Sequence, residues 1–310
     1  MPLILNQDLP VYTQLRAQCP EVLAQEGTYT EDQVHSLLLF NLMTDKVGTE
    51  FQYLRCLGTA RQFVRVEFLR QTTYRSQRQN EGYLQRFYLK PQDIFNREFD
   101  AMIITGAPLE RISCEDTLYW EEFCKVLDWS KTHVHSLFAG CWGAFASVYR
   151  EYGVAKTDLA EKLSGIYDLQ VFAADEPLFR GCGDGLLTPL SRATDMDLEA
   201  VKNCQDLILL ASADNGSPVY LKSSDNRRFY VTGHPEYDRE RLAFEYQRDS
   251  EKVYQWQTNI PINYFPDNDP AREPYDHWIE PCRQLFRNWL EYYVDKKTAI
   301  NRQNLAAATV

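Results

Sequence analysis

Short apolar segments alternate with segments of helical periodicity along most of the chain. Apolar runs or apolar–polar alternation predict strands over residues 36–42, 62–69, 100–104 and 134–138. Hydrophobic residues at helical spacing predict helices over residues 49–57, 119–129 and 142–152. Strands that alternate with helices are typical of a mostly parallel sheet with helices on both faces, so we predict an α/β fold.

The pattern changes after Gly165. Short apolar segments over residues 206–211, 218–222 and 228–231 predict an antiparallel extension of the sheet, and late helices are predicted over residues 242–253 and 284–294. No linker divides the chain. We therefore predict an N-terminal extension packed on the body (residues 1–35), a single domain (residues 36–296) and a flexible tail (residues 297–310).

Composition narrows the classes of partner. The chain has 310 residues and a formal net charge of −11, which argues against nucleic acid as the main partner. No apolar run reaches transmembrane length, so no membrane partner is expected. The eight cysteines are scattered without a CxxC pair, which indicates free thiols in a reducing cytoplasm. His133 and His135 alternate without a suitably spaced Cys or carboxylate, and no metal site is predicted.

Cys141 has a setting that the other cysteines lack. It follows a predicted strand, precedes a predicted helix, and lies between Gly140 and Gly143. A sharp strand-to-helix turn of this kind exposes a nucleophile and lets backbone N–H groups face a developing oxyanion. The start of the helix also favours the thiolate form of the cysteine.

A base and a carboxylate follow later in the chain. His234 comes after a predicted strand, and Glu236 lies two residues on. In extended backbone such residues point to the same side, so the carboxylate can hold the imidazole in one tautomer. Cys141, His234 and Glu236 therefore form a candidate catalytic triad.

A third signal is the turn Gly106-Ala107-Pro108, which follows the strand predicted over residues 100–104. Small residues let backbone N–H groups approach a ligand closely, so the turn is a candidate oxyanion or substrate-carbonyl cradle. Both this turn and Cys141 fall at the carboxyl ends of predicted parallel strands, where ligands bind in such sheets.

These motifs carry a family resemblance. In their order, the Gly-Ala-Pro turn, Gly-Cys-Trp-Gly and His-Pro-Glu resemble the class I glutamine amidotransferase superfamily, and more closely the homoserine O-acyltransferases of methionine biosynthesis. The segments that carry the closer resemblance are 41–43, 46, 49–50, 103–109, 129–134, 141–144, 161–165, 191–192, 231–238, 248–249, 263–266, 288–290 and 292–293. The resemblance runs from about residue 2 to residue 294 and implies a flavodoxin-like α/β fold.

The resemblance implies a ping-pong acyl transfer. Cys141 would attack the thioester of an acyl-CoA, and His234, oriented by Glu236, would then activate the hydroxyl of L-homoserine. The backbone N–H groups of Trp142 and Leu109 would hold the oxyanion. Further residues that the resemblance assigns to substrate binding are Lys46, Lys162, Ser191 and Arg248. Acyl-CoA would be a co-substrate, with no permanently bound cofactor, and a homodimer is compatible with the family.

Glu110 is the candidate determinant of the acyl group. In the resembled family, Glu at this position accompanies acetyl-CoA and Gly accompanies succinyl-CoA. A carboxylate in the acyl pocket would repel the succinyl carboxylate and occupy its space, which favours acetyl-CoA here. The alternative interpretation is a solvated Glu that starts a helix.

This chain departs from the family pattern at several positions, so acceptors other than homoserine stay possible alternatives. Thr44 replaces a proline, Val47-Gly48 replaces Ile-Glu, Leu190 replaces a histidine, and Ile279-Glu280-Pro281 replaces Arg-Ser-His. L-Serine, one methylene shorter than homoserine, is therefore an alternative acceptor, because a methylene provides modest discrimination. Homoserine O-succinyltransferase, glutaminase and a non-catalytic binding protein are the remaining alternatives.

Overall fold

The computed structural model describes residues 2–25, 27–74, 80–183, 185–251 and 259–295; the predicted tail at 297–310 lies outside the described residues. The strands are β1 Leu3–Ile4, β2 Val34–Phe40, β3 Phe63–Leu69, β4 Tyr88–Leu89, β5 Phe99–Ile104, β6 Val134–Gly140, β7 Lys156–Val171, β8 Leu186–Met196, β9 Leu207–Ala213, β10 Pro218–Ser223 and β11 Arg228–Val231.

The α-helices are α1 Pro10–Gln18, α2 Lys46–Leu57, α3 Glu81–Phe87, α4 Pro91–Ile94, α5 Trp120–His133, α6 Trp142–Tyr152, α7 Leu198–Asn203, α8 Arg241–Ser250 and α9 Ile279–Trp289. Short 3₁₀ turns are η1 Pro20–Val22, η2 Glu31–Gln33, η3 Pro177–Phe179 and η4 Pro266–Asn268, and η5 Leu290–Val294 is a π-helical turn that continues α9.

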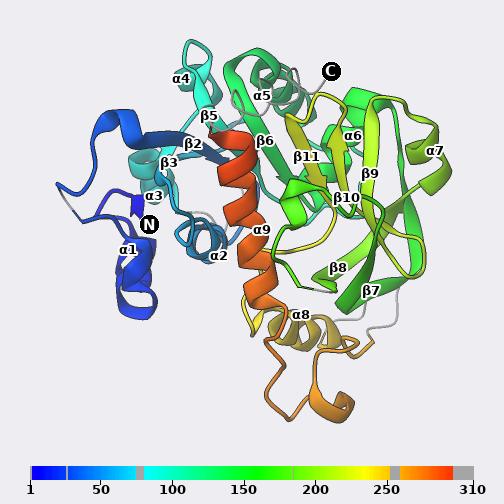
Figure 1. Cartoon of the computed structure of the whole chain (residues 1–310). Helices are drawn as coiled ribbons and strands as arrows, with labels where there is room; N and C mark the ends of the chain where they lie inside the picture. Colours follow the sequence, from blue (N-terminus) through cyan, green and yellow to red (C-terminus); the bar gives the residue numbers. More distant parts are fainter. Residues whose placement is uncertain (1, 26, 75–79, 184, 252–258, 296–310) are drawn as a thin grey trace.

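The described strands join into one eleven-stranded sheet in the order β1-β3-β2-β5-β6-β11-β10-β9-β7-β8, with β4 beside β3. Pairing is parallel from β1 to β11 and antiparallel from β11 to β8. The prediction of a mostly parallel α/β sheet with an antiparallel extension is thus confirmed. Figure 1 shows α9 crossing in front of this sheet.

The central strands are buried on both faces. Successive side chains of such a strand point to opposite faces of the sheet and pack into two different hydrophobic clusters. In β5, Ala101 and Ile103 belong to one hydrophobic cluster, whereas Met102 and Ile104 belong to the other. The first cluster receives side chains from α1, α2 and α9, and the second from α5 and α6. This double burial explains why these strands read as continuous apolar runs in the sequence.

Two long strands, β7 and β8, were not predicted. The first half of β7 is mostly exposed and alternates too few apolar residues to be recognised. It is held by antiparallel pairing with β8 over most of its length, and Gly165 makes a backbone bridge to Ile262. A Cβ on Gly165, whose φ is 141°, would lie 2.3 Å from the Ile262 carbonyl oxygen, so this crossing requires glycine.

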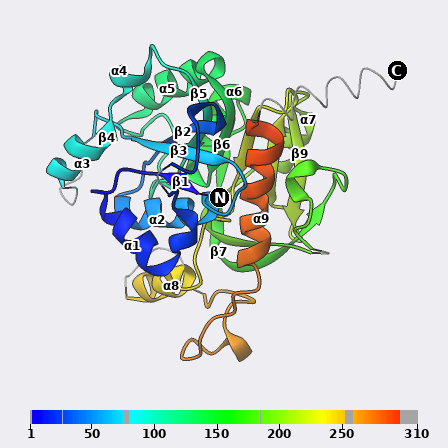
Figure 2. The same cartoon turned by 60° about the vertical axis from the view of Figure 1, so that its left-hand side comes forward.

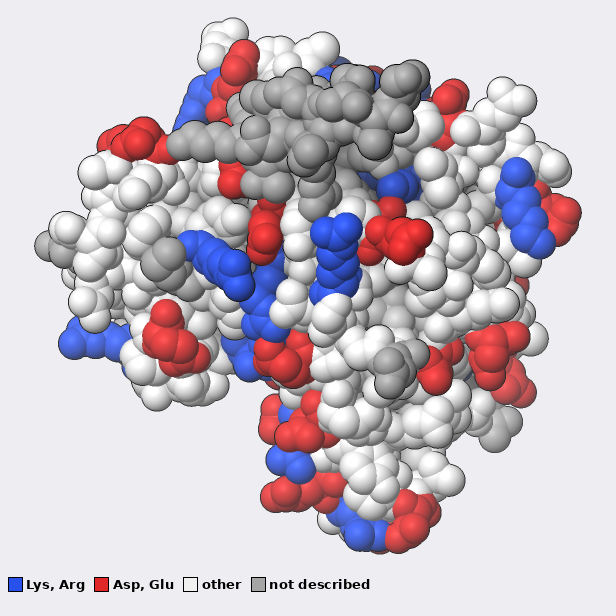
Figure 3. Space-filling view, viewed as in Figure 1, with Lys and Arg blue, Asp and Glu red and all other residues white. Residues whose placement is uncertain are grey.

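The N-terminal segment contributes structure of its own. β1 extends the parallel sheet beside β3, and Val11 and Leu15 of α1 join the cluster that α2 enters. Figure 2 shows α1 beside α2. On the face drawn in Figure 3, basic side chains lie singly or in small groups beside acidic ones. Among the described residues, no helix is both long enough and apolar enough to span a membrane.

Candidate active site

Cys141 lies on a strained turn between β6 and α6. Its backbone has φ 46° and ψ −119°, a conformation that non-glycine residues adopt at a cost and that clusters at functional sites. The turn is fixed because the Cys141 N–H donates to the Val231 carbonyl at 2.7 Å, while the Cys141 carbonyl accepts from Ala144 and Phe145. Cys141 is 6% exposed, so the sequence-based expectation of an exposed nucleophile is wrong; neighbouring segments pack over it.

The glycines beside Cys141 have a steric cause. A Cβ on Gly140 would lie 2.7 Å from the Tyr53 hydroxyl, and one on Gly143 would lie 2.7 Å from the Thr105 carbonyl oxygen. Small residues therefore let the turn sit against α2 on one side and the end of β5 on the other.

His234 and Glu236 meet as the sequence predicted. His234 Nδ1 lies 2.8 Å from Glu236 Oε1, and the imidazole is close enough to the Cys141 side chain for the two to interact electrostatically. Burial alone would lower the pKa of His234, but the nearby Cys141 and Glu236 charges outweigh it and raise the pKa well above its ordinary value. The three side chains are therefore arranged for nucleophilic catalysis, with His234 between thiol and carboxylate.

Two residues that sequence analysis missed support the imidazole. The Tyr237 ring stacks on the His234 ring with centroids 4.1 Å apart, and the Tyr237 hydroxyl donates to Glu245 Oε1 at 2.9 Å. Glu245 also accepts from Arg241 Nε at 3.0 Å and from the Ser191 hydroxyl at 2.5 Å. Positions 241, 245 and 248 lie on one face of α8, and this spacing was the available signal.

The two candidate oxyanion donors differ. Trp142 is the first residue of α6, so its N–H is among those that lack an intrahelical acceptor. The Leu109 N–H instead donates to the Ala107 carbonyl at 2.8 Å. A Cβ on Gly106 would lie 3.6 Å from Cys141 Sγ, which brings this turn directly beside the nucleophile. The roles of Trp142 and Leu109 stay predictions, and Leu109 would have to give up its bond within the turn.

A cleft of about 610 Å³ borders this turn and is rich in charge; we term it the charged cleft. It is lined by Met43, Thr44, Asp45, Pro108, Leu109, Glu110, Arg111, Ile112, Lys162, Arg241, Phe244, Arg248 and Asp249. Cations and carboxylates that share one cleft suit a zwitterionic ligand such as an amino acid.

The predicted substrate residues Lys162 and Arg248 meet in this cleft. Both donate to Asp249, Lys162 Nζ to Oδ2 at 2.8 Å and Arg248 Nε to Oδ1 at 2.7 Å. Burial alone would lower the pKa of Lys162, but Glu245 and Glu110 outweigh it and raise the pKa. Lys162 is therefore held charged at the wall of the cleft.

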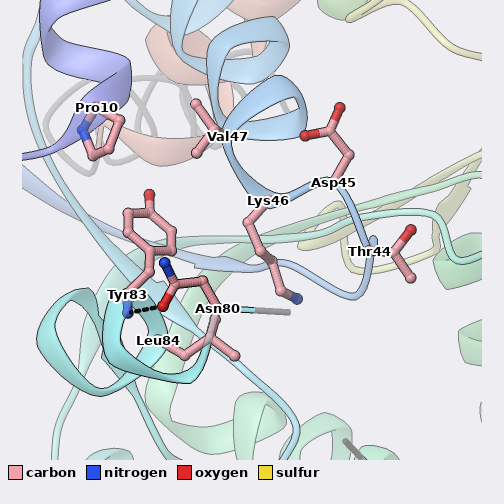
Figure 4. A pocket seen from close by; sticks show the side chains of 8 residues that line it. All are labelled: Pro10, Thr44, Asp45, Lys46, Val47, Asn80, Tyr83 and Leu84. Atoms are coloured by element: carbon pink, nitrogen blue, oxygen red, sulfur yellow. Dashed lines mark hydrogen bonds between the residues drawn. The ribbon is translucent and has the colours of Figure 1, made fainter. Parts of the chain in front are cut away.

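Ser191 and Lys46 lie outside that lining. Ser191 is buried and donates to Glu245, which in turn accepts from Arg241 of the lining. Lys46 begins α2 and lines a neighbouring cleft that shares Thr44 and Asp45 with the charged cleft (Figure 4). Its ammonium donates to the Asn41 carbonyl at 2.6 Å, and burial lowers its pKa to about 7. Substrate roles for both residues stay predictions.

Glu110 follows the Gly106–Leu109 turn and connects it to the antiparallel strand β8. Its Oε2 accepts from the Ala193 N–H at 2.9 Å, and its own carbonyl accepts from Lys156 Nζ. Glu110 is half-buried in the charged cleft, and is thus neither a freely solvated residue nor the start of a helix. Among residues 2–295, where described, no group of three His, Cys, Asp or Glu is placed to hold a metal ion.

Comparison with known proteins adds a family. A family model described as homoserine O-succinyltransferase matches residues 2–300. The chain is 38% identical to a homoserine O-acetyltransferase of Lysinibacillus sphaericus, over 96% of each chain. It is 41% identical to that of Methanomassiliicoccus intestinalis, over 96% of this chain and 97% of the relative. It is 36% identical to a homoserine O-succinyltransferase of Pseudoalteromonas translucida, over 96% and 94%.

Solved structures share the fold. A glutamine amidotransferase of Methylobacillus flagellatus superposes with a TM-score of 0.55 at 10% identity, covering 83% of this chain and 94% of the other. One of Thermotoga maritima gives 0.54 at 12% identity, covering 84% and 99%. These identities speak for the fold alone, which is the class I glutamine amidotransferase-like α/β fold.

Proposed function

The chain belongs to the homoserine O-succinyltransferase family, and from this premise we propose that it transfers an acetyl group from acetyl-CoA to the hydroxyl of L-homoserine through a thioester on Cys141. Homoserine O-acyl transfer is the function that its relatives support over nearly the whole chain. The observation that supports the covalent mechanism is that Cys141, on its strained turn, lies beside the hydrogen-bonded pair His234 and Glu236.

In the first half-reaction, the Cys141 sulfur attacks the acetyl carbonyl carbon of acetyl-CoA. The carbon–sulfur bond to CoA breaks as the new one to Cys141 forms, and the proton held by His234 leaves with the CoA thiol. The Trp142 N–H at the start of α6 would stabilise the oxyanion. Acetyl-Cys141 and neutral His234 remain.

In the second half-reaction, His234 takes the proton of the homoserine hydroxyl as the oxygen attacks the acetyl carbon. The thioester bond breaks, O-acetylhomoserine forms, and the Cys141 thiolate is regenerated beside the imidazolium. Glu236 stabilises that imidazolium through Nδ1, 2.8 Å away.

The acceptor's charges match the charged cleft. Arg248 and Lys162 would pair with the homoserine carboxylate, and Asp249, which binds both in the free protein, would exchange contacts when the ligand enters. Ser191 would act through Glu245.

Glu110 supports acetyl over succinyl. Its carboxylate is fixed by the Ala193 N–H beside Leu109, where the acyl chain of an acyl-enzyme at Cys141 would extend. A succinyl carboxylate there would face a second negative charge in a partly dry site, which is costly.

A CoA-release assay tests the proposal. Acetyl-CoA and succinyl-CoA are each combined with homoserine and with serine, and products are identified by mass. We expect O-acetylhomoserine to be formed with the highest kcat/KM. Turnover with succinyl-CoA well above acetyl-CoA would overturn the acyl assignment.

L-Serine is the second candidate acceptor. Leu190, where the family pattern has histidine, is completely buried in the core, and Thr44 lines the charged cleft in place of proline. The same assay separates the acceptors, because O-acetylserine as main product would redirect the assignment to cysteine synthesis.

Glutaminase activity uses the same three side chains and the same fold. Incubation with glutamine in the absence of acyl-CoA distinguishes it: ammonia release without any CoA-dependent reaction would contradict acyl transfer.

A further inference from the structure

A further cleft adjoins the charged cleft at the Pro108–Leu109 turn. It measures about 260 Å³ and is lined mainly by apolar side chains, among them Leu42, Leu109, Ile112, Leu118 and Tyr119, together with Gln71. We term it the apolar cleft. It shares Thr44, Pro108, Leu109 and Ile112 with the charged cleft, so the two meet at one rim.

Large apolar side chains are exposed at this cleft. Leu118 is 72% exposed, and Ile112 and Tyr74 are also exposed. Exposed apolar side chains that gather around a concavity mark binding sites, because their hydration is relieved when a ligand covers them.

Gln71 supplies a polar anchor point. Its side chain is 4% exposed, and its Oε1 is buried with no hydrogen-bond partner among the described residues. A buried amide oxygen without a donor costs free energy, and only an N–H or O–H group can satisfy it. The cleft therefore suits a largely apolar ligand that carries N–H groups.

The apolar cleft adjoins the nucleophile by two routes. The Tyr119 ring meets the ring of Trp142, the residue after Cys141, edge to face with centroids 5.9 Å apart. The second connection runs along the chain. Pro108 and Leu109 line the cleft, and Gly106, two residues before Pro108, lies against Cys141. The lining of the apolar cleft therefore contacts the neighbours of Cys141 on both sides, while Cys141 itself is buried and lines neither cleft.

We propose that the apolar cleft binds the pantetheine arm of the acyl-CoA, with Gln71 Oε1 accepting from one of its amide N–H groups. The arm is a chain of methylenes and amides, which matches both the apolar lining and the unpaired acceptor. The inference rests on the proposed acyl-CoA-dependent function and holds for any acyl group. It gives the two substrates separate clefts that meet at the Pro108–Leu109 turn.

Leu118→Ser tests the apolar contact. Because Leu118 is largely exposed, the variant should fold normally, while KM for acetyl-CoA should rise roughly tenfold with kcat and the homoserine KM unchanged. Phe172→Ser, at an exposed aromatic residue beyond the end of β7, is the matched control and should leave all three constants unchanged. An unchanged donor KM in Leu118→Ser would overturn the proposal.

Gln71→Leu separates binding from stability. The variant removes an unsatisfied buried acceptor, so its melting temperature should be unchanged or higher, while KM for acetyl-CoA rises several-fold. A lower melting temperature with an unchanged donor KM would show that Gln71 serves the fold instead of the donor.

The last experiment uses an acetyl donor that lacks the pantetheine arm. With S-methyl thioacetate, wild type and Leu118→Ser should transfer acetyl equally well. An equal loss with both donors would place the effect at Cys141 and contradict the proposed arm site. If wild type releases no CoA from any acyl-CoA, the proposed function fails instead.

Discussion

The imidazole of His234 lies flat against the phenol ring of Tyr237, with centroids 4.1 Å apart and planes 18° from parallel. The Tyr237 hydroxyl is tied to Glu245, which also holds Ser191 and Arg241. We therefore infer that Tyr237 is a positioning residue that connects His234, the proposed general base, to Arg241 at the wall of the charged cleft.

Removing the Tyr237 ring should lower activity more than removing its hydroxyl alone. We expect Tyr237→Phe to retain most activity, and Tyr237→Ala to lose roughly 10- to 100-fold in kcat, because a displaced imidazole no longer reaches both partners. The kcat pH profile of Tyr237→Ala should also shift, which a purely structural loss would not produce. Equal activity of the two variants, or an unshifted profile, would contradict this role.

Glu245 should stabilise the protein in a pH-dependent way. Burial alone would raise its pKa, but Lys162 and Arg241 outweigh it and lower the pKa to about 2 from an ordinary 4.5. A lowered carboxyl pKa stabilises the fold above pH 4.5, and this contribution is lost as the pH falls from 4.5 toward 2.

Comparison of wild type with Glu245→Gln tests that sign. The difference in free energy of unfolding should be about 3 kcal/mol at pH 7 and should shrink toward pH 3. Urea unfolding at both pH values measures it. A difference that is equal at pH 7 and pH 3 would contradict the assigned charge contacts.

A side chain at position 106 should impair the reaction more than it impairs folding. An alanine Cβ there would lie 3.2 Å from Cys141 Cβ and 3.9 Å from His234 Cε1. We expect Gly106→Ala to lower kcat/KM at least about tenfold with a small change in melting temperature. Gly82→Ala, in the exposed helix α3, is the control and should retain full activity. A fully active Gly106→Ala would show that the turn and sulfur are less closely coupled than the geometry implies.

Glu110 should set the preference between acyl donors. In Glu110→Gly, the ratio of kcat/KM for succinyl-CoA to that for acetyl-CoA should rise at least about tenfold, because both the opposing charge and its volume are removed. Glu110→Gln keeps the volume and removes the charge, so an intermediate ratio is expected. Unchanged ratios in both variants would leave acyl selection to other residues.

The parallel half of the fold could be predicted from the sequence because its strands are buried on both faces. The predicted strand over 100–104 and the structural strand Phe99–Ile104 differ by one residue, since Ala101 to Ile104 are all buried. β7 was missed because Lys156 to Lys162 are largely polar and are held in a strand by tertiary pairing with β8.

The candidate catalytic residues could be proposed from the sequence for a different reason. Cys141 and the pair His234 and Glu236 each stand in a short motif whose local geometry implies their chemistry. Tyr237 and Glu245 carry no such motif, and their place beside His234 depends on how α8 packs against β8, through Ser191. Sequence periodicity contains no information on that packing.

Acyl transfer through Cys141 requires that this residue carry the acyl group between the two half-reactions. The enzyme is incubated with acetyl-CoA in the absence of any acceptor, quenched in acid and digested, and its peptides are weighed. We predict one acetyl group on the peptide that contains Cys141, none in Cys141→Ala, and its loss with formation of O-acetylhomoserine when homoserine is added before the quench. An unmodified Cys141 peptide, with CoA released only when homoserine is present, would contradict acyl transfer through Cys141.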